Sequence, residues 1–373
     1  MSVVRIGIVG IGNMGTSHAR YIAAGEVAGA ELAAVCDIST ERLLWAKEQF
    51  GQQLQTFETV DAMLDSGAVD AIMICNLHFD HPGTSMKAFA RGIHVLCEKP
   101  AGVYTKQVRE MNEAAEKSDV KFSMMFNQRT NPLYIKLKDL IASGELGEIR
   151  RTNWIITTWY RTQSYYDSGN WRATWAGEGG GVLLNQCPHQ LDLWQWAVGM
   201  MPTRVRAFCS FGKYRDIEVE DEVTAYVEYP NGATGVFITT TGETPGTNRF
   251  EITGDRGKVV IEDGKLTFWR LRVSEPEFNK NAKAGFGQPE CWKIDVPVAA
   301  GPKQHMAVTQ NWVDAIRKGT PLIAPGQEGI NGLTLSNAMY LSAWTDNWAD
   351  LPLDEDRFHE LLQERIASSR FKK

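Results

Sequence analysis

The stretch Arg5-Ile6-Gly7-Ile8-Val9-Gly10-Ile11-Gly12-Asn13-Met14-Gly15 decides the fold of the first third of the chain. Its apolar start is typical of a buried strand, and the amphipathic segment Ser17–Ala24 that follows is typical of a helix. A G-x-G-x-x-G run between a strand and a helix favours dinucleotide binding. Gly10 permits the tight turn, Gly12 lets a pyrophosphate approach the backbone, and Gly15 lets the helix pack closely on the strand.

The same alternation of strand and helix continues to about residue 126. Short apolar runs are expected to form the remaining strands of this part, at Glu31–Cys36, Ala71–Cys75, His94–Cys97 and Lys121–Phe126. Amphipathic segments between them are expected to be helices, at Thr40–Phe50, Pro82–Arg91 and Thr105–Glu116. Near-continuous apolar strands separated by helices indicate a parallel sheet that is covered on both faces. We therefore predict an α/β Rossmann domain over residues 1–126.

The cofactor of this domain is expected to be NAD. The phosphate-binding candidates are the residues of the turn and of the first helical turn, namely Gly10, Gly12, Asn13, Met14 and Gly15. Asp37 closes the second strand, where a carboxylate can accept hydrogen bonds from ribose hydroxyls and repels a 2′-phosphate. NADP is therefore the less favoured alternative, for which Arg42 would have to meet the 2′-phosphate.

Two polar residues follow the third strand at the edge of the sheet where ligands bind in open α/β folds. Asn76 and His81 are therefore candidates for contact with the ribose or nicotinamide. The alternative for His81 is that it caps the helix beginning at Pro82, and His78 is as well explained as an ordinary loop residue.

Past residue 126 the pattern changes to long strands and few helices. A helix is expected at Pro132–Ser143, a strand at Ile149–Tyr160, an apolar helix near Leu183–Val198, and a meander from Val205 to about Trp269. Three more helices are expected to close the chain, near Lys303–Lys318, Gly329–Asn347 and Asp354–Ser369. We predict an α+β domain over residues 127–373 with a large, mostly antiparallel, open-faced sheet. Whether the C-terminal helices pack back on the first domain stays open.

Composition excludes several classes of protein. The chain has 373 residues with a net charge of -6, so there is no basic footprint for nucleic acid. No apolar run approaches the length of a membrane span, and the N-terminus leads directly into a strand rather than into a signal peptide. The six cysteines form no C-x-x-C pair, and reduced thiols in a cytoplasmic protein are favoured over a disulfide framework or a zinc site.

The fourth strand ends in Cys97-Glu98-Lys99-Pro100. The later domain contains a second motif, Gly179-Gly180-Gly181-Val182-Leu183-Leu184-Asn185-Gln186-Cys187-Pro188-His189-Gln190-Leu191-Asp192. Together with the glycine fingerprint, these segments resemble the Gfo/Idh/MocA family of oxidoreductases, which includes glucose-fructose oxidoreductase and inositol dehydrogenase. The resemblance covers essentially the whole chain. It implies that Lys99 and His189 are catalytic, with Lys99 also beside the cofactor, and that Glu98 helps to frame the cofactor ribose.

One position departs from the inositol dehydrogenase pattern. Relatives of that kind carry an aspartate four residues before the histidine, where this chain has Asn185. An amide can hold a hydroxyl group but cannot accept its proton at neutral pH. The proton is therefore expected to leave through His189, or through Lys99 if that amine is partly neutral. Asp192 lies one helical turn after His189 and can support its imidazole.

Aromatic residues interleaved with polar ones precede the glycine motif, between Trp159 and Arg172. Flat aromatic faces suit the C–H surfaces of a sugar, and the polar groups suit its hydroxyls. Tyr160, Trp171 and Arg172 are therefore the substrate-binding candidates, together with Asn185 and Asp192. Packing in the core or at an interface is the alternative explanation for these aromatic residues.

The predicted function is an NAD-dependent dehydrogenase or reductase acting on a secondary alcohol of a sugar, glycoside or cyclitol. By resemblance to a subgroup, the 3-hydroxyl is the expected position. Two alternatives stay open: an NAD-dependent glycosidase that works by transient oxidation and elimination, and a non-catalytic nucleotide or sugar sensor. The open sheet must bury its second face, so a homodimer or homotetramer is expected.

Overall fold

The structure is a computed structural model that describes residues 3–371. Two compact units divide these residues: one comprises residues up to 130 together with 302–333, and the other comprises residues 131–301 together with 334 onward. The first unit thus takes in a helical segment from late in the chain. The two units are described separately below.

The first unit is a doubly wound α/β domain, as the sequence predicts. Its six parallel strands have the spatial order β3-β2-β1-β4-β5-β6. The strands are β1 (Val4–Val9), β2 (Ala30–Cys36), β3 (Gln55–Phe57), β4 (Ala71–Ile74), β5 (His94–Cys97) and β6 (Phe122–Met124). The helices are α1 (Asn13–Ala23), α2 (Thr40–Phe50), α3 (Val60–Asp65), η1 (His78–Asp80), α4 (His81–Phe89), α5 (Thr105–Glu116), η2 (Asn127–Thr130), α10 (Gln304–Lys318) and η4 (Gly326–Glu328). The sequence reading missed the short elements β3 and α3. The order of the strands reverses between β1 and β4, which is where such sheets bind nucleotides.

Helix α10 belongs to the core of this unit. Its Val308, Trp312 and Val313 are fully buried and lie in one hydrophobic cluster with Ile6 and Ile8 of β1. The indole nitrogen of Trp312 also donates a hydrogen bond to the carbonyl oxygen of Lys121 at 3.2 Å. The strand that carries the glycine turn is therefore packed by residues some 300 positions away in sequence.

The second unit contains a nine-stranded sheet of order β14-β13-β12-β11-β7-β10-β9-β8-β15. Its strands are β7 (Ile149–Ile156), β8 (Arg204–Phe211), β9 (Glu220–Glu228), β10 (Thr234–Thr240), β11 (Asn248–Gly254), β12 (Gly257–Glu262), β13 (Lys265–Leu271), β14 (Cys291–Val296) and β15 (Ala349–Asp350). Neighbours are antiparallel except β7 and β10, so the sheet is mostly antiparallel, as expected. The sequence reading missed β14 and β15. It also extended β7 to residue 160, whereas the pairing of β7 with β11 ends at Ile156.

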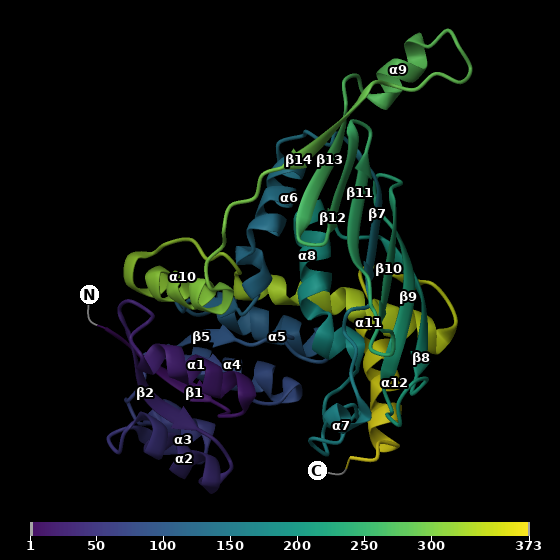
Figure 1. Cartoon of the computed structure of the whole chain (residues 1–373). Coiled ribbons are helices and arrows are strands. Elements are labelled where there is room, and N and C mark those ends of the chain that lie inside the picture. The colour runs from purple at the N-terminus through teal and green to yellow at the C-terminus, as the bar shows by residue number, and fades with distance from the viewer. Residues whose placement is uncertain (1–2, 372–373) are drawn as a thin grey trace. The chain divides into compact units, whose positions relative to one another are not determined.

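The second unit also contains helical segments. They are α6 (Pro132–Ala142), α7 (Gln163–Tyr166), η3 (Val182–Gln186), α8 (Pro188–Val198), α9 (Glu275–Asn281), α11 (Gly329–Thr345) and α12 (Glu355–Ala367), of which α11 begins in the first unit. Trp194 of α8 stacks on Phe237 of β10 at 5.4 Å between ring centroids. The β13–β14 hairpin extends past the sheet and carries α9 at its tip (Figure 1).

The predicted single helix over Leu183–Val198 is wrong. The chain instead forms the π-helical turn η3 and then a new α-helix that has Pro188 in its first turn. Proline has no backbone N–H and is tolerated at a helix start but not in a helix interior. The break therefore separates Asn185, at the end of η3, from His189, at the start of α8.

Candidate active site

The glycine turn between β1 and α1 has the geometry that a dinucleotide requires. Gly10 has φ +89°, and a Cβ there would lie 2.8 Å from the carbonyl oxygen of Cys75. A Cβ on Gly15 would overlap the carbonyl oxygen of Gly10, so the helix packs directly on the turn. Gly12 caps α1 without a side chain, and among the described residues no atom lies within 4 Å of where its Cβ would stand. This opening leaves room for a phosphate at the positive end of the helix dipole.

Asp37 lies at the end of β2 and is joined to the same turn. Its Oδ2 accepts a hydrogen bond from the backbone N–H of Ile11 at 2.8 Å, and its Oδ1 accepts one from Ser39 at 2.9 Å. Each carboxylate oxygen has further acceptor capacity, which a ribose hydroxyl can use. The neighbouring Ile38 side chain is 95% exposed, so an apolar surface stands beside the carboxylate. The residues present thus fit the ribose and base of a dinucleotide.

Asn76 and His81 lie close together after β4. The Asn76 amide nitrogen donates to Thr84 Oγ1 at 3.2 Å. The His81 ring is almost fully buried, with Nδ1 2.7 Å from the carbonyl oxygen of Pro100 and Nε2 3.1 Å from that of Asn76. Burial lowers the pKa of His81 although both carbonyl groups raise it, so we treat the ring as neutral. A neutral ring donates only one hydrogen bond, and the shorter contact assigns it to Pro100.

Glu98 and Lys99 form the end of β5. The Lys99 side chain is half-buried and the Lys99-Pro100 bond is cis. The Glu98 carboxylate is 7% exposed; its Oε2 accepts from the Lys99 N–H at 3.2 Å and its Oε1 lies 2.7 Å from Nε2 of His18. Burial raises the pKa of Glu98, but the hydrogen bond to His18 and the charges of His18, Lys99 and His305 outweigh burial and lower it to about 2. A permanent carboxylate therefore stands directly before the lysine.

A chain of polar groups continues from Glu98 into the core of the first unit. His18 of α1 is fully buried, and its Nδ1 lies 2.6 Å from the hydroxyl of Tyr21. The Tyr21 hydroxyl in turn lies 2.8 Å from Oγ1 of Thr309 on α10. Three elements that are distant in sequence thus meet through side-chain hydrogen bonds behind Lys99.

In the second unit, a buried carboxylate holds the Gly179-Gly180-Gly181 turn. Glu220 at the start of β9 is 1% exposed and accepts hydrogen bonds from the N–H groups of Gly181 at 2.9 Å and Leu183 at 2.8 Å. Burial raises the pKa of Glu220 to about 7, although these two N–H groups and the Tyr340 hydroxyl lower it. Glu220 therefore fixes the start of the segment that carries Asn185 and His189.

Asn185 and His189 lie four residues apart on that segment, and both side chains are half-buried. The Asn185 amide nitrogen donates to Glu178, whose other carboxylate oxygen accepts from the Ala173 N–H at 2.6 Å. Asp192 is 1% exposed, and the Gln195 amide lies 3.3 Å from its Oδ1. Asn185 and His189 thus reach solvent, whereas Asp192 lies in the interior.

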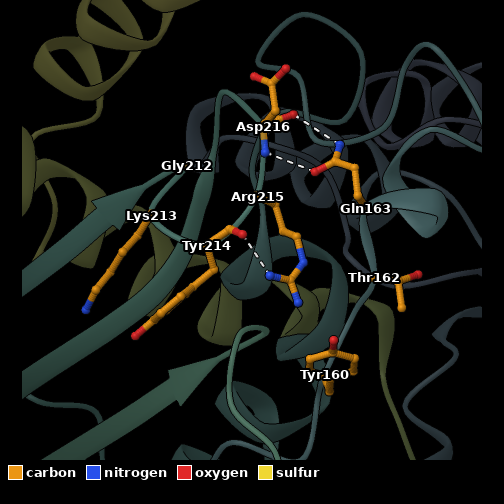
Figure 2. A pocket seen from close by; sticks show the side chains of 8 residues that line it. All are labelled: Tyr160, Thr162, Gln163, Gly212, Lys213, Tyr214, Arg215 and Asp216. Carbon is orange, nitrogen blue, oxygen red and sulfur yellow. Dashed lines mark hydrogen bonds between the residues drawn. The ribbon is translucent and has the colours of Figure 1, made fainter.

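Tyr160 lies at an open hollow of about 660 Å³ between the segment after β7 and the β8–β9 turn (Figure 2). The Arg215 guanidinium lies 5.2 Å from the centre of the Tyr160 ring. Two carbonyl groups hold it there, because Nε donates to Arg161 at 2.9 Å and Nη1 donates to Tyr214 at 2.7 Å. Figure 2 also shows the reciprocal hydrogen bonds between Gln163 and Asp216. The hollow thus presents an aromatic face beside a fixed cation.

Trp171 and Arg172 form a separate cluster with Tyr165. The Arg172 guanidinium lies 4.4 Å from the centre of the Trp171 ring and 4.8 Å from that of Tyr165, and its Nη1 donates to the Tyr165 hydroxyl at 3.1 Å. The cation is therefore stacked between aromatic rings and held in one orientation.

Sequence reasoning missed four residues that shape these sites: His18, Glu178, Glu220 and Arg215. Glu220 stands in an acidic run, Glu218-Val219-Glu220-Asp221-Glu222, which has the appearance of a solvated strand edge. Its hydrogen bonds to the N–H groups of Gly181 and Leu183 depend on tertiary packing. His18 was detectable in principle, since it lies three residues before Tyr21 on the buried side of an amphipathic helix.

Comparison with known domains agrees with this geometry. Residues 4–126 match the domain described as "Oxidoreductase family, NAD-binding Rossmann fold", and residues 134–260 match the "GFO/IDH/MocA C-terminal domain". This chain belongs to the GFO/IDH/MocA family of oxidoreductases, and its first unit is the NAD-binding Rossmann domain of that family. The predicted fold class and family are thereby confirmed.

Individual relatives agree on the class of protein. The rhizopine catabolism protein MocA of Rhizobium meliloti is 33% identical over 56% of this chain and 62% of its own length, so the match spans less than two thirds of that relative. Myo-inositol 2-dehydrogenase of Thermotoga maritima is 25% identical over 90% of this chain and 95% of its own length. The WlbA dehydrogenase of Bordetella pertussis, solved with NADH and UDP-GlcNAcA, has a TM-score of 0.78 and 27% identity over 94% of this chain and 100% of that one.

Proposed function

We propose that this protein is an NAD-dependent dehydrogenase that acts on a secondary alcohol of a sugar, glycoside or cyclitol. The observation that carries the proposal is the half-buried Lys99, which directly follows a Glu98 carboxylate bound to His18 of α1, in a chain whose Asn185 and His189 are also half-buried. Relatives named as inositol 2-dehydrogenases and as a glucose-6-phosphate 3-dehydrogenase support the substrate class. Bound NAD would supply the hydride acceptor, with Gly10, Gly12, Asn13, Met14 and Gly15 at its phosphates, Asp37 at its ribose, and Asn76, His81 and Glu98 framing it further.

In this proposal Lys99 and His189 act on the same reacting hydroxyl. The ammonium of Lys99 stabilises the oxygen as it gains negative charge, and the His189 imidazole takes the proton. The Asn185 amide cannot take that proton, so it holds a substrate hydroxyl instead. Asp192 is buried, and its carboxylate supports the helix that carries His189 rather than reaching into solvent.

Replacing these two residues tests their roles. A general base contributes on the order of 10²–10⁴-fold to the rate, so His189→Ala should lower turnover by about that factor while NAD still binds. Lys99→Ala should behave likewise, and Lys99→Arg should not restore activity because a bulky fork replaces a compact ammonium. Near-normal turnover in either alanine variant, with NAD affinity unchanged, would contradict the assignment.

On the substrate side, we propose that the aromatic faces of Tyr160 and Trp171 receive C–H surfaces of the sugar. The Arg172 guanidinium would then donate hydrogen bonds to hydroxyl or carboxylate oxygens of the sugar. The reacting position proposed from the family is the 3-hydroxyl. Tyr160→Ala and Trp171→Ala should each raise KM for the sugar more than KM for NAD, and equal effects on both constants would argue against these contacts.

One screen separates the proposal from its rivals. NAD reduction is followed over inositols, free sugars and glycosides while release of aglycone is measured in the same wells. Net NADH formation is expected for a dehydrogenase. A glycosidase working by transient oxidation returns its hydride, so aglycone would appear without NADH. Cofactor binding without turnover on any polyol would favour a sensor.

We further propose that the open face of the large sheet forms a homodimer or homotetramer. The strand registers place Phe208, Thr224, Ile238 and Ile155 in one row across β8, β9, β10 and β7. Phe208 is 62% exposed in the single chain. Covering such a row on association is favourable at roughly 25 cal/mol per Å² of apolar area. Light scattering at micromolar concentration should give a multiple of 41.7 kDa, and a monomeric mass would contradict this.

The proposed location is the cytoplasm. All six cysteines lie within residues 3–371 and carry free thiols, which is typical of a reducing compartment. Within the described residues, none of the helices has the length and apolar character needed to cross a bilayer. Fractionation of cells that express the tagged protein would test the location.

A further inference from the structure

Two buried imidazoles bracket the Glu98-Lys99-Pro100 turn, and no step of the proposed reaction uses either of them. His18 of α1 reaches the turn through the Glu98 carboxylate at 2.7 Å. His81 of α4 reaches it through the Pro100 carbonyl oxygen at 2.7 Å. Their exposed fractions are 0% and 1%, so each is inaccessible to substrate. Lys99 stands between the two points of attachment.

Each ring also has a contact at its second nitrogen. His18 Nδ1 contacts the Tyr21 hydroxyl, which is tied to Thr309 of α10. His81 Nε2 contacts the Asn76 carbonyl oxygen directly after β4. Rotation of either ring breaks the buried hydrogen bond that joins it to the turn, which costs roughly 1–3 kcal/mol per unsatisfied group.

We infer that His18 and His81 are paired positioning residues that set the place of Lys99 from opposite sides of its turn. The inference rests on the proposed function in one respect, which is that Lys99 acts on the reacting hydroxyl. Neither histidine exchanges a proton with substrate. Their contribution is geometric, and a misplacement of a catalytic group by about 1 Å lowers rates on the order of 10²-fold.

The test uses leucine at both positions and glutamine at position 18. His18→Leu and His81→Leu remove the hydrogen bonds but keep apolar bulk, and each should lower kcat on the order of 10²-fold with KM for the sugar changed less than threefold. Glutamine carries a donor near the position of Nε2, so His18→Gln should recover at least about tenfold of the loss. Because both residues act on one turn, the double leucine variant should be no more than about threefold slower than the worse single variant.

His94 supplies the matched control. It stands at the opposite end of the same strand β5, where its Nδ1 accepts a hydrogen bond from the Lys121 N–H at 2.9 Å. His94→Leu therefore removes a histidine from β5 without touching the turn. It should lower the melting temperature without lowering kcat of the folded enzyme.

Hydrogen–deuterium exchange gives a readout that needs no turnover. Amides of residues 98–102 should exchange faster in His18→Leu and His81→Leu than in wild type or His94→Leu. Unchanged exchange there overturns the inference, and so does faster exchange with wild-type kcat. A catalytically silent Lys99→Ala overturns the proposed function instead, so the two failures are distinguishable.

Discussion

Stability should depend on pH through Glu220, the carboxylate below the glycine turn. Its pKa is about 7 in the folded protein, against an ordinary value of 4.5. A pKa raised by folding means that the folded state binds the proton more tightly, so this group favours folding below pH 4.5 and loses that advantage as pH rises through 7. At 1.36 kcal/mol per pKa unit, the loss amounts to about 3 kcal/mol.

The substitution Glu220→Gln removes the titratable carboxyl group and keeps the size and shape of the side chain. A glutamine offers one carbonyl oxygen to the two N–H groups of Gly181 and Leu183, so it leaves one contact unsatisfied at a cost of roughly 1–3 kcal/mol. At pH 5 the variant should therefore be less stable than wild type. By pH 8.5 the difference should shrink or reverse, because wild type then buries a charge.

Urea unfolding of both proteins at pH 5, 6, 7 and 8.5 measures this directly. The informative quantity is the wild-type free energy of unfolding minus that of the variant. The contributions of the other titrating groups cancel in this difference. A difference that stays constant within 0.5 kcal/mol (about a sixth of the predicted change) would refute the reasoning. It would mean that the hydrogen bonds from the Gly181 and Leu183 N–H groups fully offset the effect of burial on the pKa of Glu220.

Three further outcomes are expected. Gly10→Ala strains a position with φ +89° and brings its Cβ 2.8 Å from the Cys75 carbonyl oxygen. Because such strain costs roughly 1–3 kcal/mol, NAD affinity measured by fluorescence titration should fall at least about tenfold. Unchanged affinity would contradict the described turn. Asp37→Ala should weaken NAD about 10–100-fold, the equivalent of a charged hydrogen bond, and should weaken NADP less; equal losses for the two cofactors would argue against a ribose contact. Trp154→Ala removes a fully buried ring stacked on Phe250 at 4.1 Å and should cost about 3–5 kcal/mol in chemical unfolding, whereas a loss below 1 kcal/mol would mean that the core refills.

The first unit was largely predictable because its signals are local. The β1–turn–α1 segment combines an apolar run, glycines at set spacing and an amphipathic helix, and each of these is read without knowledge of the rest of the chain. The helices Thr40–Phe50 and Thr105–Glu116 were predicted with the bounds that the structure shows. The three-residue strand β3 was not, because three residues carry too little periodicity.

The second unit was predicted less well, for physical reasons that particular residues illustrate. The apolar run Leu183–Val198 has a helical composition throughout, and only the missing N–H of Pro188 divides it. The strand β14 has mostly exposed residues, so it lacks the alternation that marks a half-buried strand. The segment forms a strand through its pairing with β13, and this pairing cannot be read from the local sequence.

Within the site, the sequence indicated which groups carry chemistry but not what holds them. Lys99, Asn185 and His189 follow from motifs. Glu98, by contrast, was expected only at the cofactor, and its attachment to His18 across 80 positions has no local signature. Positioning contacts of this kind form only when folding brings His18 of α1 to the residue that follows β5, which a local sequence pattern does not encode.

The return of α10 to the first unit has a consequence for how the chain is made. Trp312 and its neighbours complete a core whose other half, including Ile6 and Ile8, leaves the ribosome about 300 residues earlier. During synthesis the apolar surface of the first unit that α10 covers therefore stays exposed while the large sheet is being made. Emergence of α10, rather than emergence of residue 126, allows that surface to be covered.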